Sequence, residues 1–123
     1  MPEQMLICKH LAEALSVLAH PHRIRIIEEL RMRESCQVQV LVEKLCLSQP
    51  TVSKHLGQLR RHGLVEGRRR GRVICYSLTQ GWLADWLAEG TKIIETRQLD
   101  NVQMIEALRS VRKLWQPSLE TGV

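Results

Sequence analysis

The segment that decides the fold reads Ser48-Gln-Pro-Thr-Val-Ser-Lys-His-Leu-Gly-Gln-Leu-Arg-Arg-His-Gly63. Its apolar side chains recur at helical spacing, at Val52, Leu56 and Leu59. Such spacing indicates one buried face of a helix. Ser48 is a preferred N-cap, and Gly63 is placed as a C-terminal stop. The segment therefore predicts a helix over residues 49–62 that packs by one side and leaves the other side free.

The free side of this helix carries amides, hydroxyls and cations, which are donors and acceptors for base edges and phosphates. The candidate DNA contacts on it are Gln49, Thr51, Ser53, Lys54, His55, Gln58 and Arg61. We expect Lys54 and Arg61 to hold phosphates and the uncharged side chains to face bases, although His55 lies towards the buried side. Gly57 has no side chain on the free face, which lets a backbone approach DNA closely, at about 1 kcal/mol in helix propensity.

Three helices are predicted before this one. Apolar spacing indicates a helix over residues 4–19, and His20-Pro21 ends it because a residue before proline is pushed out of the helical region. A second helix follows over residues 21–33. After a polar connection with an extended residue or two, a short third helix spans residues 38–45. With the turn Cys46-Leu47 and the helix after it, this third helix forms a helix-turn-helix over residues 38–62.

After Gly63 the hydrophobic period changes from helical to alternating, which is typical of strands. We predict a strand at 64–66, a turn at 67–71 and a second strand at 72–78. Four cations gather at the turn, namely Arg68, Arg69, Arg70 and Arg72. The predicted fold is therefore mainly α (α+β), a winged helix-turn-helix with a two-stranded β-wing. Residues from 80 onwards are again helical, with Gly90 as a bend and Asp100 as a cap.

Charge supports the same region. Residues 48–79 contain seven basic residues and one acid, while the remaining residues of this +5 chain are close to neutral. A basic patch on a neutral body indicates a polyanionic partner, and here the expected partner is double-stranded DNA. The alternatives are a solvated charged face, or a winged helix that serves only as a protein-interaction module. Such a module would not distinguish an operator from random DNA.

Other classes of protein are excluded by what the sequence lacks. No apolar run approaches the roughly 20 residues that cross a bilayer, so no membrane contact is expected. The start of the chain does not resemble a signal peptide, so we expect a cytoplasmic protein. The four cysteines lack a C-x-x-C pattern and are expected to be free thiols. No nucleophile–base pair or phosphate loop suggests an enzyme, and no cofactor is expected.

Four stretches carry a resemblance to a known family: Ala14 to Ile27, Leu47 to Leu56, Leu59 to Val65, and Gly71-Arg-Val-Ile-Cys-Tyr-Ser-Leu78. Together they resemble the ArsR/SmtB transcriptional repressors, over roughly residues 10–95. The resemblance implies a homodimeric repressor that binds an inverted-repeat operator and is released by a signal. It also implies a single domain over 1–116, with dimerisation helices at 1–19 and 80–116, followed by a flexible tail at 117–123.

The sensing sites of that family are not repeated here. The thiolate positions of its metal sensors fall on Gln37 and Gln39, and amides do not replace thiolates for soft metals. Residues 80–123 hold no histidine, so the second familiar metal site is absent and no metal site is expected. Cys8 and Cys36 are candidates for a thiol sensor that pairs across the dimer. The alternative is that Cys8 and Cys46 are only small buried apolar side chains. His20 and His22, either side of a proline, are expected to be capping or surface groups.

Overall fold

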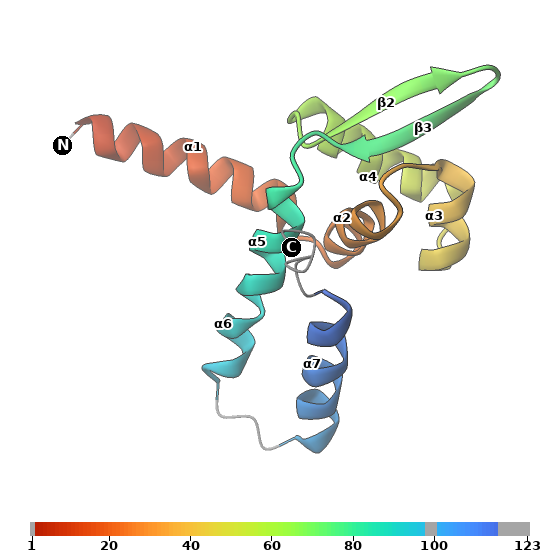
Figure 1. The fold of residues 1–123 in the computed structure, drawn as a ribbon. Helices are drawn as coiled ribbons and strands as arrows, with labels where there is room; N and C mark the ends of the chain where they lie inside the picture. The colour runs from red at the N-terminus through yellow and green to blue at the C-terminus, as the bar shows by residue number, and fades with distance from the viewer. Residues whose placement is uncertain (1, 98–100, 116–123) are drawn as a thin grey trace, which may run out of the picture. The chain divides into compact units, whose positions relative to one another are not determined.

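The computed structural model describes residues 2–97 and 101–115. They belong to two compact units, Met1–Gln80 and Gly81–Val123. Figure 1 shows the first unit as helices α1 to α4 with a small sheet, and the second as helices α5 to α7.

The helices of the first unit lie where the sequence places them. They are α1 (Pro2–Leu18), α2 (Pro21–Arg33), α3 (Val38–Leu45) and α4 (Gln49–Arg61). The predicted apolar face of α4 is confirmed, because Val52, Leu56 and Leu59 are at most 1% exposed. The α4 helix contacts α2, α3 and the strand that contains Val65, whose buried side chains include Ile26, Ile27, Leu30 and Leu41.

Local signals in the sequence explain the ends of these helices. Ser48 caps α4, because its Oγ accepts the backbone N–H of Thr51 at 3.3 Å. The α3 helix ends at Cys46, which adopts a left-handed conformation with φ of 56° and donates its N–H to the carbonyl of Val42. Gly63, with φ of 73°, follows α4 in the left-handed region that glycine adopts readily. Cys46 and Ser48 therefore fix the two ends of the turn between α3 and α4.

The sheet has three antiparallel strands in the order β1-β3-β2. They are β1 (Cys36–Gln37), β2 (Val65–Arg70) and β3 (Val73–Leu78). The extended residues predicted before α3 are therefore confirmed as β1, which pairs with β3. This pairing fixes the start of α3 to the strand that returns from the wing.

The predicted wing turn was wrong in its length. Residues 67–70 continue β2, and Arg70 pairs directly with Val73, so the turn holds only Gly71 and Arg72. Gly71 has φ of 66°, as the first position of a type II′ hairpin turn prefers. Gly67, expected in the turn, instead lies opposite Tyr76, where an added Cβ would meet the Tyr76 ring at 3.0 Å. The missing side chain of Gly67 leaves room for the Tyr76 ring within the sheet.

The second unit contains α5 (Trp82–Gly90), α6 (Lys92–Glu95) and α7 (Val102–Leu114). The predicted interruption at Gly90 is confirmed, since α5 ends there and α6 starts two residues later. Asn101 caps α7 by accepting the N–H of Gln103 at 2.8 Å. The residue predicted for this role, Asp100, lies outside the described residues, as does the predicted tail at 117–123.

Several apolar side chains of α1 and of the second unit are exposed in the single chain. In α1 they are Met5, Leu11 and Leu15, and in the second unit they are Trp82, Trp86 and Ile93. The periodicity identified an apolar face in α1 and in the second unit, and among the described residues these side chains remain exposed. Among the described residues, no helix is long and apolar enough to span a membrane.

Candidate nucleic-acid interface

The outward face of α4 is polar and open. Its side chains Gln49, Ser53, Lys54 and Arg61 are exposed, as is Gly57, and no atom lies within 4 Å of where a Gly57 Cβ would stand. Gln58 is half-buried. The helix therefore presents an amide, a hydroxyl and two cations on the side opposite its packed face. These groups can donate to phosphates and base edges.

Thr51 is less free than its neighbours. Its hydroxyl lies 2.8 Å from the Ser48 hydroxyl, and its N–H is bonded to the same oxygen. The side chain is thus engaged in the cap of α4, and its half-buried position leaves a smaller surface for DNA than Ser53 has.

His55 faces inward rather than towards the open side of α4. It is 7% exposed, and its Nδ1 accepts a hydrogen bond from the Arg23 Nε at 3.1 Å. Burial lowers the pKa of His55, and the nearby His20 and Arg23 lower it further. The neutral imidazole is therefore the favoured form near pH 7. The Arg23 guanidinium also donates to the carbonyl of Val17, so this contact joins α2 and α4 to the end of α1. Spacing alone did not indicate this pairing of Arg23 with His55.

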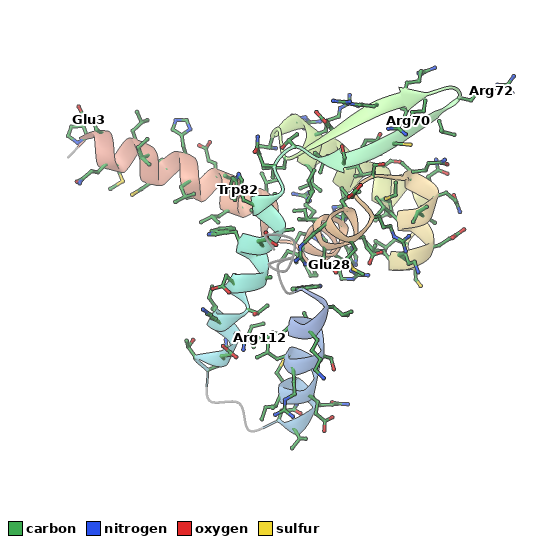
Figure 2. The ribbon with its side chains drawn as sticks, in the orientation of Figure 1. Glu3, Glu28, Arg70, Arg72, Trp82 and Arg112 are labelled. Atoms are coloured by element: carbon green, nitrogen blue, oxygen red, sulfur yellow. The ribbon has the colours of Figure 1, made fainter. Side chains whose placement is uncertain are left out.

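The four wing arginines do not share one face. Because side chains alternate along a strand, Arg68 and Arg70 of β2 point to one face and Arg69 to the other. The Arg68 guanidinium also lies 3.6 Å from the Glu66 carboxylate, but an exposed ion pair of this kind contributes little to stability. Figure 2 shows Arg70 and Arg72 at the far end of the hairpin. The tip therefore carries two cations that have no acid beside them among the contacts of the described residues.

The charge predicted for residues 48–79 is available to a partner. All seven of its basic side chains are exposed, on the outward part of α4 and along β2 to the tip. A reading helix followed directly by a cationic hairpin in one compact unit is the arrangement of a winged helix-turn-helix.

Known proteins agree with this geometry. A family model described as a helix-turn-helix domain matches residues 18–68. The HTH-type transcriptional regulator Rv0081 of Mycobacterium tuberculosis is 37% identical over 99 residues, which cover 80% of this chain and 87% of Rv0081. The arsenical resistance operon repressor of Staphylococcus xylosus is 35% identical over 88 residues, which cover 72% of this chain and 83% of the repressor. The crystal structure of NolR from Sinorhizobium fredii, 33% identical, superposes with a TM-score of 0.67 over 76% of this chain and 92% of NolR.

The chain belongs to the ArsR/SmtB family of winged helix-turn-helix transcriptional repressors. It is a DNA-binding transcriptional regulator, and not an enzyme, because the members that it matches are transcriptional regulators and repressors. The interaction-only alternative is not favoured for the same reason.

The cysteines of this ArsR/SmtB repressor differ in accessibility. Cys8 on α1 and Cys46 after α3 are exposed, Cys75 on β3 is half-buried, and Cys36 on β1 is buried. Burial raises the pKa of the Cys36 thiol, although the nearby Arg33 acts against this. A surface hollow of about 670 Å³ adjoins Cys36 and Cys75. Gln37 and Gln39, which stand at the family's thiolate positions, line the same hollow.

These differences predict an order of thiol labelling. With iodoacetamide near neutral pH, Cys8 and Cys46 should be alkylated first, and Cys36 at least about tenfold more slowly, because it is buried and the thiolate is the nucleophile. Because the pKa of the Cys36 thiol is raised, its labelling should keep speeding up as the pH rises above neutral. Peptide mass spectrometry measures each site, and in denaturant all four should react alike. Equal rates in the folded protein would show that Cys36 is accessible.

Proposed function

We propose that this repressor binds an inverted-repeat operator as a homodimer, with α4 in the major groove and the wing against the adjacent backbone or minor groove. The observation that carries the proposal is the exposed polar face of α4, continued by a cationic hairpin whose tip holds Arg70 and Arg72. The major groove, about 12 Å wide, admits one helix, and the recognition helix of a helix-turn-helix occupies it. For such a function we expect the protein in the cytoplasm, where it would meet chromosomal DNA.

The roles of the side chains follow from their chemistry and exposure. Lys54 and Arg61 would hold phosphates, since they are exposed cations on the open face of α4. Gln49, Ser53 and Gln58 would read base edges, and an amide bonds well to adenine. We assign no base contact to His55, because it is buried against α2, and only a minor one to Thr51. The wing arginines Arg68, Arg69, Arg70 and Arg72 would contact phosphates.

Homodimerisation is supported by the apolar faces that the single chain leaves open. Leu11 is 54% exposed in the middle of α1, and Trp82 is 61% exposed at the start of α5. Contiguous exposed apolar residues on a helix are a mark of an interaction surface. Pairing through the terminal helices would cover these side chains and place two α4 helices on one operator.

Competition binding tests the proposal. An operator is first selected from a pool of duplexes, and its affinity is then compared with that of random DNA by fluorescence anisotropy. Lys54→Ala and Arg61→Ala should each weaken operator binding about tenfold or more, because each removes a cation from a phosphate. The matched control is Lys9→Ala, an exposed cation on α1 outside the basic segment. If the α4 variants bind as tightly as this control, α4 does not lie on DNA.

Gly57→Ala separates folding from DNA binding. Alanine favours a helix interior over glycine by about 1 kcal/mol, and no atom lies within 4 Å of the new Cβ. The free energy of unfolding should therefore rise, while operator affinity falls, because the methyl group enters the surface that faces DNA. Denaturant unfolding and anisotropy measure the two effects. A variant that is more stable and binds equally well would show that the α4 backbone does not approach DNA closely.

The release signal in this proposal is thiol-based, through Cys8 and Cys36. Cys8 is exposed, whereas the raised pKa of Cys36 makes it a slow nucleophile, so Cys8 would react first. The DNA complex is titrated with oxidant, persulfide and As(III), in wild type and in Cys8→Ser and Cys36→Ser variants. Release that persists in both variants would exclude this pair as the sensor.

A further inference from the structure

Three histidines from two helices meet in the first unit. His20 caps α2, His22 lies in the first turn of α2, and His55 projects from the middle of α4. Their ring centroids are 5.2 Å apart for His20 and His22, 4.4 Å for His20 and His55, and 5.6 Å for His22 and His55. One ring nitrogen from each lies within 4.8 Å of the others. Among the described residues, His20, His22 and His55 are the three potential metal ligands whose nitrogens come this close together.

We propose that His20, His22 and His55 form a binding site for one divalent transition-metal ion that joins α2 to α4. Imidazole nitrogens suit Zn²⁺, Ni²⁺, Co²⁺ and Cu²⁺. This site lies elsewhere than the two metal sites of the family that are missing from the sequence, which fall near Gln37 and in residues 80–123. The prediction that His20 caps a helix is confirmed, since its Nδ1 accepts the N–H of His22 at 3.2 Å. A metal ion bound to His20 would replace this capping bond, because a neutral imidazole has only one nitrogen with a free lone pair.

The local sequence explains why the ligands converge. Pro21 fixes the first helical position, so the residues on either side of it are placed at the start of α2. His55 reaches the same place from α4 because it lies next to the buried Leu56 and is itself buried. The other two rings are only half-buried, which leaves a side open for water or a further ligand. Three histidines with one open position are a common ligand set for zinc.

Metal binding requires the three ligand nitrogens to move closer together. With metal–nitrogen bonds of about 2.0–2.1 Å, tetrahedral ligand atoms stand about 3.3 Å apart. Nitrogens now within 4.8 Å must therefore approach one another by up to about 1.5 Å, which rotation about the side-chain bonds of the half-buried His20 and His22 can supply.

The ion and Arg23 compete for His55. A neutral imidazole has one nitrogen with a free lone pair, and in His55 that nitrogen accepts from the Arg23 Nε. A metal bound at Nδ1 takes this lone pair, and a metal bound at the other nitrogen requires a proton on Nδ1, so both break the Arg23 bond. Arg23 keeps its second bond, to the carbonyl of Val17. Its positive charge and that of Lys54 oppose a cation, so we expect weaker binding than in sites with anionic ligands.

Co²⁺ titration of the full-length, chelator-treated protein tests the site. Wild type should bind one ion per chain with the strong visible absorption of a tetrahedral centre. It should show no sulfur-to-cobalt charge-transfer band, because no cysteine is a ligand. His22→Gln should lower the affinity by more than the roughly 10–100-fold that loss of an outer-shell partner costs. The matched control is His62→Gln, an exposed histidine directly after α4 and outside the cluster, which should bind like wild type.

Two further measurements keep the test decisive. His22 is half-buried, so His22→Gln should keep the fold, which far-ultraviolet circular dichroism verifies. Arg23→Gln should bind Co²⁺ about tenfold more tightly, because it frees His55. Equal binding by His22→Gln, a thiolate band, or no binding by wild type would overturn the site. Weaker binding by Arg23→Gln would overturn the competition. None of these outcomes depends on whether the protein binds an operator.

Discussion

Replacing Arg70 and Arg72 at the wing tip by glutamine should weaken operator binding by about 10²–10³-fold near physiological salt. Both side chains are exposed at the end of the hairpin, so the fold should not change. In a dimer the substitutions remove up to four phosphate contacts. Each lost contact reduces the slope of log K against log[salt] by about 0.9, so the dependence should become shallower by up to about 3.6. Anisotropy titrations over a range of salt concentrations measure both quantities.

A control of equal charge makes this result specific. Lys9→Gln with Arg109→Gln also removes two positive charges, from exposed positions outside the basic segment. It should leave the salt dependence close to that of wild type. If both double variants lose the same affinity, the wing acts only through the overall charge of the protein and contacts no phosphate.

Leu11→Glu in α1 should convert the dimer to a monomer and lower operator affinity by more than about 100-fold, because one half-site then binds alone. Leu11 is exposed in the single chain, so a glutamate there costs the monomer fold little. In a dimer interface the same carboxylate would be buried without a partner, which is costly. Sedimentation velocity measures the oligomeric state.

The matched control introduces the same residue one position earlier in α1. His10→Glu lies beside Glu13, and the His10 and Glu13 side chains are 69% and 75% exposed. This variant should remain dimeric and bind DNA. A dimeric Leu11→Glu variant would show that the apolar face of α1 is not the interface.

The α-helices of the first unit could be predicted from the sequence because their signals are local. Ser48 marks a helix start by its side chain, whereas Pro21 and Gly63 mark helix ends by their backbone preferences. The spacing of Val52, Leu56 and Leu59 identified the packed face of α4. The wing was harder. The two glycines suggested a long turn, but Gly67 is in the strand because Tyr76 needs the space, and this pairing is seen only in the register of β2 and β3.

The candidate site was predicted in part. The exposed side chains of α4 follow from its periodicity, whereas the inward contact of His55 depends on Arg23, which is 32 residues away in the sequence. The meeting of His55 with His20 and His22 is equally non-local. Apolar faces such as that of Trp82 were identified from their spacing, and Trp82 is exposed in the single chain, since periodicity shows that a face is apolar and not what covers it.

The connection between α3 and α4 limits how a signal can reach DNA. Cys46 and Leu47 both donate their backbone N–H groups to the carbonyl of Val42, and Ser48 at once caps the next helix. A turn tied in this way has no free hinge. The two helices must therefore move as one rigid body, so an inducer has to tilt or displace the pair as a whole rather than bend the turn between them.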